Sequence, residues 1–115
     1  MGKGNPFGNM GNVPGLGNMM KQVQKMAEDT QRLEEELGRQ RIEATSGGGM
    51  VKAVANGRGE VLEIKIDRQV VDPEDVEMLE DLVVSAVREA LEKGIEMKQS
   101  RLQELTGGLN IPGLF

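Results

Sequence analysis

The side chains best suited to bind a ligand by charge in this sequence are lysines and arginines at helical spacing. Lys25, Arg32 and Arg39 are seven residues apart, and Lys21 lies one turn before Lys25. Residues two helical turns apart share one face of an α-helix, so a helix over this stretch would carry a basic stripe. Such a stripe can contact the phosphates of a nucleic acid, and the alternative is a row of ordinary solubilising side chains.

Acidic neighbours offset part of this stripe. Glu28 precedes Arg32 by four residues and Glu35 precedes Arg39 by four, a spacing at which opposite charges attract on a helix. The two lysines, like charges one turn apart, repel each other weakly. They leave the start of the helix locally positive.

A second basic group lies further along the chain. Residues 93–101 hold three basic side chains, Lys93, Lys98 and Arg101, against one acid, a net charge of +2. Glu89 precedes Lys93 by four residues and can pair with it, whereas no acid lies four residues from Lys98. If a two-fold axis doubles both groups, the basic ends of two helices form a surface that can contact phosphates.

The chain as a whole is nevertheless acidic, with a net charge of −5. Residues 73–92 carry seven acidic side chains against Arg88 alone, a net of −6, so the remainder is close to neutral. Nucleic-acid binding draws most of its affinity from cations on phosphates. Because the acidity is confined to one stretch, basic groups elsewhere can still present a usable surface.

Other kinds of chemistry find little support. The chain has no cysteine and no histidine, which excludes disulfides, thiolate metal sites and the usual acid/base at neutral pH. The glycine-rich stretches 47–52 and 57–59 lie between expected strands and lack the G-x-x-x-x-G-K-S/T spacing of a phosphate-binding loop. The acidic clusters fall on regular helix patterns, where a solvated face explains them. We therefore predict no catalytic residue, no cofactor, no metal site and no enzyme.

An apolar seam predicts the helix that positions the first basic group. Between Asn18 and Gly38 its positions are spaced 4-3-4-3-4. They are Met19, Val23, Met26, Thr30, Leu33 and Leu37. Asn18 can cap the start of the helix, and Gly38 weakens its end. The helix is either a core helix of a globular domain or an antiparallel or paired helical arm.

Three strands are expected next, forming an antiparallel meander with one apolar face. The first covers residues 41–46 and the second residues 50–55, with glycines between them. Asn56 and Gly57 predict a tight hairpin turn after the second strand. The third strand should turn three alternate apolar side chains to one face: Leu62, Ile64 and Ile66.

A long helix should follow the sheet. Asp72 is its expected N-cap, and Pro73 fits the first helical position. The apolar pattern continues to Leu105, with Gly94 as a point where the helix can kink or break into two. Residues 79–91 are apolar on more than one side, which leaves apolar surface to be covered.

These elements predict an α+β fold in two layers: a long helix, a three-stranded antiparallel meander and a long C-terminal helix. We interpret residues 1–17 as a flexible arm rich in glycine, asparagine and proline, residues 18–106 as one domain and residues 107–115 as a C-terminal tail. The open edges of the meander and the surplus apolar surface favour a two-fold homodimer. No signal peptide or membrane-spanning run is present, so a soluble cytoplasmic protein is expected.

Two longer stretches are more informative than any short motif. They are residues 47–67, GGGMVKAVANGRGEVLEIKID, and residues 71–90, VDPEDVEMLEDLVVSAVREA. Together they resemble the YbaB/EbfC family of bacterial nucleoid-associated proteins, and the similarity extends from Met19 to Gly108. The resemblance implies a helix–three strands–helix protomer that forms a homodimer with helices projecting like tweezers. It also implies binding to DNA at the nucleoid in the cytoplasm, with altered DNA conformation or compaction and effects on gene expression.

The resemblance further implies that both the first and the last helix contact DNA. By position, this gives six candidate DNA-binding residues: Lys21, Lys25, Arg32, Lys93, Lys98 and Arg101. The only aromatic residues are Phe7 and Phe115, so there is little means of stacking single-stranded bases, and duplex DNA is the favoured partner. The alternative hypothesis is a protein–protein adaptor or chaperone-like clamp, which acidic helix faces and projecting helices would also suit.

Overall fold

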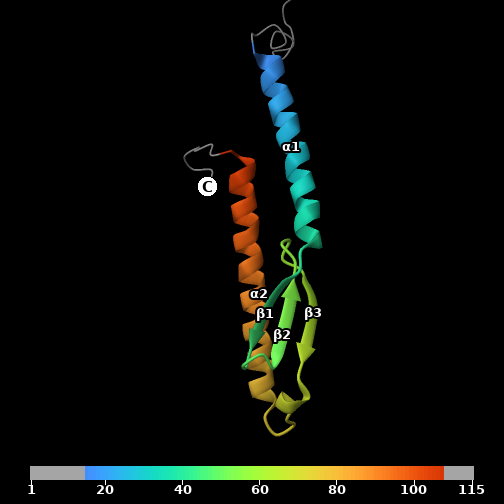
Figure 1. Cartoon of the computed structure of the whole chain (residues 1–115), viewed down its shortest axis with the longest axis vertical. Coiled ribbons are helices and arrows are strands. Elements are labelled where there is room, and N and C mark those ends of the chain that lie inside the picture. The colour runs from blue at the N-terminus through green and yellow to red at the C-terminus, as the bar shows by residue number, and fades with distance from the viewer. Residues whose placement is uncertain (1–14, 108–115) are drawn as a thin grey trace, which may run out of the picture.

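The structure, a computed structural model, describes residues 15–107. It contains helix α1 (Leu16–Arg39), strands β1 (Ile42–Ser46), β2 (Val51–Ala55) and β3 (Val61–Ile66), the short 3-10 helix η2 (Arg68–Val70) and helix α2 (Val76–Leu105). The strands form one antiparallel sheet in the order β1-β2-β3. Figure 1 shows α2 lying along the sheet while α1 extends away from it. The predicted α+β class and order of elements are confirmed.

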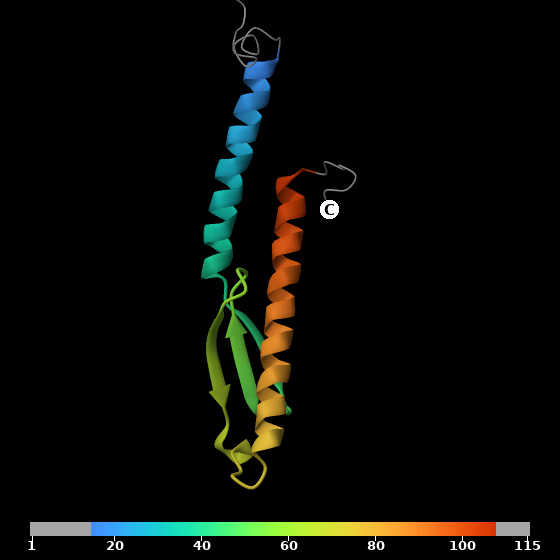
Figure 2. The same ribbon diagram turned by 180° about the vertical axis from the view of Figure 1, so that it is seen from behind.

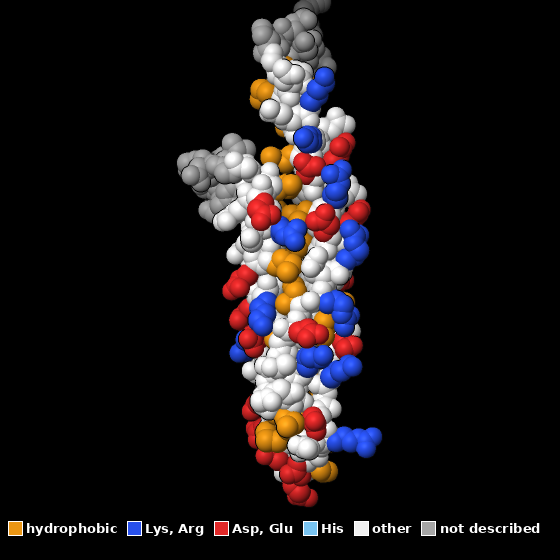
Figure 3. Space-filling view, in the orientation of Figure 1, with side chains coloured by type: hydrophobic (Ala, Val, Ile, Leu, Met, Phe, Trp, Pro, Cys, Tyr) orange, Lys and Arg blue, Asp and Glu red, His pale blue; other side chains and the backbone are white. Residues whose placement is uncertain are grey.

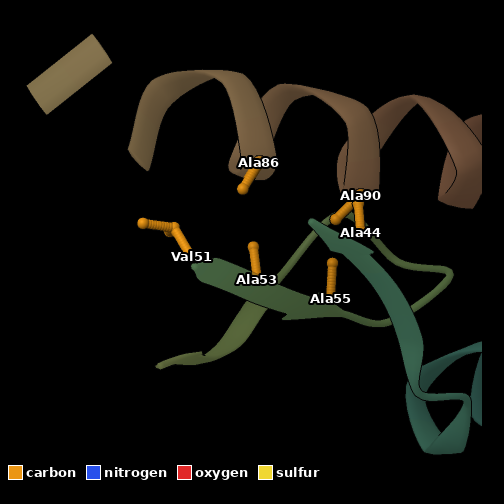
Figure 4. Packing of buried hydrophobic residues seen from close by; sticks show 6 residues of the cluster. All are labelled: Ala44, Val51, Ala53, Ala55, Ala86 and Ala90. Carbon is orange, nitrogen blue, oxygen red and sulfur yellow. The ribbon is translucent and has the colours of Figure 1, made fainter. Parts of the chain in front are cut away.

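Small side chains form the core between the sheet and α2. Alternate residues of a strand point to the same face, and in β1 and β2 the residues facing α2 are mostly alanines. The core members are Ala44, Val51, Ala53, Ala55, Ala86 and Ala90, each at most 3% exposed. Figure 4 shows the two helix alanines directed at the strand residues. Because alanine has a short side chain, α2 can approach the sheet closely, and larger residues such as Leu79 and Leu82 pack around this centre.

Strand β3 is only marginally contacted by α2. Ile64 and Ile66 pair with core residues of β2 and therefore share the face that α2 covers elsewhere, yet they remain 40% and 41% exposed. The register shifts at the end of β2, where Val61 pairs with Ala55 and Leu62 has no direct partner, because a β-bulge inserts one extra residue. The sequence pattern did not predict this bulge.

The connection between β2 and β3 is longer than the predicted tight turn. It runs from Asn56 to Glu60, and within it Gly59 has the positive φ, 87°. Asn56 is only 2% exposed, and its side-chain oxygen accepts hydrogen bonds from the N–H groups of Arg58 at 2.9 Å and Glu60 at 3.0 Å. Its side-chain nitrogen donates to the carbonyl of Gly38 at 3.2 Å. Asn56 therefore ties the end of α1 to the sheet.

Helix α1 begins earlier than predicted. It starts at Leu16, inside the stretch assigned to a flexible arm, and Gly15 is its N-cap with no side-chain hydrogen bond. Asn18 lies within the first turn instead of capping it, because the left-handed conformation of Gly15, with φ 84°, already directs the chain into the helix. The rest of the predicted arm and tail falls on residues 1–14 and 108–115, outside the described residues.

Helix α2 differs from the prediction at its start and at its middle. Residues Asp72 to Asp75 form a turn, closed by the Asp75 N–H and the Asp72 carbonyl at 2.9 Å, so Asp75 is the N-cap. The helix then runs unbroken to Leu105, and the predicted kink or break at Gly94 does not occur. Gly94 is buried, and a Cβ there would lie 2.8 Å from the backbone oxygen of Asn56. A close approach of α2 to the β2–β3 loop therefore explains this glycine.

Candidate nucleic-acid interface

Helix α1 projects beyond the rest of the molecule. Near its end, Leu33 and Leu37 are buried, at 7% and 1% exposed. Figures 1 and 2 show that α2 runs beside this part of α1 and stops while α1 continues. Leu105, the last residue of α2, lines a shallow groove with Met26 of α1. Each of the two interpretations of the first helix therefore applies to a different half of it: the second half packs in the core and the first half is an arm.

The basic side chains of α1 share a face of the helix that is separate from its apolar seam, although Lys25 and Arg32 border grooves that seam residues also line. Because the helix is continuous from Leu16 to Arg39, the spacing of Lys25, Arg32 and Arg39 puts them on one face, with Lys21 one turn earlier. These four residues are called the basic stripe, which extends over about 27 Å at 1.5 Å per residue. Within residues 15–107, the two lysines and Arg39 have no carboxylate within 4.0 Å.

The ion pairs expected along α1 are not the ones observed. Arg32 pairs with Asp29 at 3.5 Å and not with Glu28. Arg39, which the sequence analysis treats as offset by Glu35, has no acidic partner within 4.0 Å in the described part of the chain. Arg39 is exposed and therefore belongs to the candidate surface, although it is absent from the six predicted residues. Its spacing from Arg32 is the signal that identifies it.

Two of the predicted basic residues of α2 are held by acids of α1. Lys98 pairs with Glu34 at 3.4 Å, and Arg101 pairs with Glu36 at 3.6 Å. These side chains are between 42% and 45% exposed, so the pairs lie at the rim of the α1–α2 contact. Spacing along α2 could not reveal these partners, because they lie on a different helix.

Lys93 lies apart from the other candidates. It pairs with Glu89 at 3.8 Å, as predicted, and donates a hydrogen bond to the carbonyl of Glu43 in β1 at 3.2 Å. The six predicted residues thus do not form one uniform patch. Lys21 and Lys25 lie on the projecting half of α1 without acidic partners in the described residues, whereas the other four each contact an acid.

Charge is separated along the length of the molecule. Figure 3 shows basic side chains along the edge formed by α1, with acidic ones among them, and acidic side chains gathered at the opposite end, around the start of α2. The exposed acids of this region are Asp72, Glu74, Asp75, Glu77, Glu80 and Asp81. The negative charge that makes the chain acidic is therefore concentrated far from the projecting half of α1.

The basic stripe can bind a ligand by electrostatic attraction. Among residues 15–107 no group of three acidic side chains is arranged to hold a metal ion. Neither long helix, over that same range, has the apolar stretch needed to cross a membrane. A row of exposed lysine and arginine side chains on a helix can neutralise phosphates without any reacting group.

An exposed row of lysine and arginine side chains on a projecting helix is a surface that can bind a nucleic acid through its phosphate backbone. Sequence comparison assigns the family: the YbaB/EbfC DNA-binding family matches residues 10–109, and the chain belongs to it. The resemblance seen in the sequence is confirmed.

Similar proteins support this assignment over nearly the whole chain. A nucleoid-associated protein of Pelotomaculum thermopropionicum is 55% identical over 100 residues, which are 87% of this chain and 95% of the relative. A second, from Thermoanaerobacter pseudethanolicus, is 55% identical over 108 residues, 91% of this chain and 97% of the relative. The crystal structure of an uncharacterized protein from Helicobacter pylori matches with a TM-score of 0.60 at 28% identity, over 70% of this chain and 93% of that one.

Proposed function

We propose that this protein binds duplex DNA as a homodimer, through the basic stripe of α1, and alters the conformation or compaction of the DNA. The observation that carries the proposal is the position of Lys21 and Lys25. Both are exposed on a projecting helix and have no carboxylate within 4.0 Å among residues 15–107. Membership of a DNA-binding family and relatives named nucleoid-associated proteins support the same role.

Contacts to the DNA backbone explain how an acidic protein could bind a polyanion. A helix that lies along the backbone can bring its exposed cations to successive phosphates, and the released counterions supply the affinity. Such contacts carry no sequence information, so the binding we propose is largely independent of base sequence. Duplex DNA remains the favoured form, since the chain has only two aromatic residues on which single-stranded bases could stack.

The uncovered face of β3 supports dimerisation. Ile64 and Ile66 leave about two-fifths of their surface exposed on the face that α2 covers elsewhere, and β3 is an edge strand. Exposed apolar edge strands are usually paired or covered in soluble proteins. A two-fold dimer through β3 would cover this apolar face on both protomers. It would also present two basic stripes to DNA. Two such arms could bridge or bend a duplex, which would change its compaction and affect gene expression.

The candidates on α2 take a secondary part in this proposal. Lys98 and Arg101 are held by Glu34 and Glu36, so DNA would have to displace these acids before gaining a new contact. Lys93 is similarly engaged. We therefore assign the first contacts to Lys21 and Lys25; Arg39 lies further along the same face, and Arg32 would first have to leave Asp29. The proposed role is non-catalytic and places the protein at the nucleoid in the cytoplasm.

A salt series of DNA-binding titrations tests the proposal. If the four lysines of a dimer, Lys21 and Lys25 on each protomer, contact phosphates, log affinity should fall against log salt with a slope of about −3.6. The variant K21E/K25E should bind at least about tenfold more weakly at low salt and should lose most of this slope, because two cations per protomer become repulsive. The size of the protein, measured by light scattering, should stay that of a dimer.

A charge-matched variant makes this test specific. R68E/R88E changes the net charge by the same amount, from −5 to −9, at exposed residues that lie outside α1 and β3 and have no acidic partner within 4.0 Å among residues 15–107. It should bind DNA much as the unmodified protein does. Equal losses in both variants would show that only total charge matters and would refute the assigned surface. A protein that ignores DNA even at low salt but retains a protein partner would support the adaptor hypothesis instead.

A further inference from the structure

The apolar seam of α1 loses its cover halfway along the helix. The exposed fraction is 1% at Leu37 and 7% at Leu33, but rises to 41% at Met26, 69% at Val23 and 62% at Met19. The cause is the length of α2, which accompanies only the second half of α1 (Figure 2). The three exposed side chains share one face with the two buried leucines and are called the open seam.

The open seam lies on a segment of helix with little tertiary support, limited to the contact region of Met26 with the end of α2. Every residue from 17 to 28 is exposed. Isolated helices shorter than about 12–15 residues are marginally stable in water, because packing of an apolar face supplies most helical stability in proteins. A contiguous exposed apolar surface in a soluble protein also marks a site of contact. A cover for the open seam is therefore expected.

We propose that residues 108–115 of the same chain bind to the open seam. The sequence of this segment is GLNIPGLF, and half of its residues are large and apolar: Leu109, Ile111, Leu114 and Phe115. The segment follows α2 directly, and α2 ends beside the seam, where Leu105 lines a groove together with Gln22, Lys25, Met26 and Asp29 of α1. The segment would continue the cover that α2 supplies to the second half of α1.

The end of α2 and the reach of the chain agree with this placement. The last turn closes with the N–H of Thr106 on the carbonyl of Leu102 at 3.0 Å, and Gly107, with φ 62°, turns the chain off the helix axis. An extended chain covers up to about 3.3 Å per residue, so the residues from Leu105 to Ile111 can reach about 20 Å. The open seam is only about 10 Å long, since seven helical residues separate its ends.

Other occupants fit the open seam less well. Residues 1–14 join α1 at Gly15, beyond the far end of the seam, and would have to reverse direction to lie along it. A second copy of the chain has its large uncovered apolar surface on β3, at the opposite end of the molecule from the open seam (Figure 1). A dimer through β3 would therefore leave the open seam uncovered.

Binding of this segment would stabilise the arm and leave its first lysine untouched. Lys21 is not part of the groove lining, whereas Lys25 lines the groove with Met26, so the segment would lie beside the Lys25 side chain. The segment is thus a positioning element that keeps the projecting half of α1 helical. The inference does not depend on DNA binding and can be tested with the protein alone.

Disulfide trapping tests the contact directly, because the chain contains no cysteine. The variant V23C/I111C places one thiol on the open seam and one in the segment. Its matched control is Q24C/I111C, since Gln24 is exposed and lies about 1.5 Å further along α1 but about 100° around the helix. Under mild oxidation the first pair should form an intrachain disulfide at least fivefold faster than the control. Equal rates would overturn the proposal, and so would a bond formed mainly between the single variants V23C and I111C when they are mixed.

Hydrogen exchange provides a second measurement that introduces no change in the seam itself. Deletion of residues 108–115, or the full-length variant I111D/L114D, should raise amide exchange at residues 17–26 by at least tenfold. Exchange in β1 and β2 should stay the same, because these strands are covered by α2. Unchanged exchange at residues 17–26 in both variants would show that the segment does not cover the arm.

Discussion

The apolar seam of α1 passes through two different environments. At Leu37 the side chain is 1% exposed and lies against the β2–β3 loop, where a Cβ on Gly57 would come within 2.6 Å of it. At Val23, fourteen residues earlier on the same seam, the side chain is 69% exposed. One periodic pattern therefore serves two purposes: it closes a core at one end of the helix and leaves a surface at the other.

The charged side chains divide in the same way. In the packed half, Arg58 lies near Glu34 and Glu60, and Lys98 and Arg101 have acidic partners across the α1–α2 contact. On the projecting half, the lysines of the basic stripe have none within 4.0 Å among residues 15–107. Whether a basic side chain is free to contact a phosphate thus depends on the elements that surround it. The net charge of the chain does not reveal which basic side chains are free.

The largest effect expected from this contrast is on stability. Leu37→Ala should lower the free energy of unfolding by about 3 kcal/mol, because it leaves a cavity in a closed site. Met20→Ala, on the projecting half at 65% exposed, should change it by less than about 0.5 kcal/mol. Urea denaturation at one fixed protein concentration measures both, since dimerisation would couple stability to concentration. Similar losses in the two variants would contradict the division of α1 into a packed and a projecting half.

A smaller effect tests how closely the packed half is fitted. Gly94→Ala should destabilise the protein by about 1 kcal/mol, since overpacking of the Asn56 carbonyl, at about 1–3 kcal/mol, outweighs a gain of about 1 kcal/mol in helix propensity. The sign decides between two explanations of the glycine. If Gly94 marked a break in α2, alanine would stabilise the helix and raise the midpoint of thermal unfolding.

Gly94 also illustrates what the sequence could and could not predict. Apolar periodicity predicted both helices and the sheet, because it reports which face of an element is buried. It could not separate a glycine that breaks a helix from one that lets another backbone approach, since that depends on the distance to Asn56, distant in sequence. The bulge at Leu62 and the loop that replaces the predicted tight turn were missed for the same reason: local spacing carries no information on neighbouring strands.

The candidate site was predicted in part, for a related reason. Spacing alone put Lys21, Lys25 and Arg32 on one face of a helix, and the continuous α1 bears this out. Ion pairs between helices lie outside the reach of that argument, because the partners of Lys98 and Arg101 are about 65 residues away in sequence. Removing the acids of α1 can therefore distinguish the basic residues that are paired across the two helices from those that are not.

The smallest stability effect is expected when those interhelix pairs are removed. E34Q/E36Q should cost less than about 0.5 kcal/mol for each pair, because all four side chains are more than 40% exposed. The substitutions nevertheless free Lys98 and Arg101, whereas Arg58, the other partner of Glu34, keeps its contact with Glu60 at 3.9 Å. If DNA can then reach both, affinity at low salt should rise severalfold, and the slope of log affinity against log salt should steepen by up to about 1.8 per protomer.

The variant E28Q/E35Q removes the same charge from acids of α1 that have no basic partner within 4.0 Å among residues 15–107. It should raise affinity by reducing repulsion, but it frees no cation, so the slope should stay unchanged. The slope therefore counts contacts, whereas the affinity also reflects total charge. A steeper slope in E34Q/E36Q alone would mean that acids of the packed half restrict binding to the arm. Equal slopes in both variants would mean that α2 never reaches the DNA and that the projecting half of α1 is the whole binding surface.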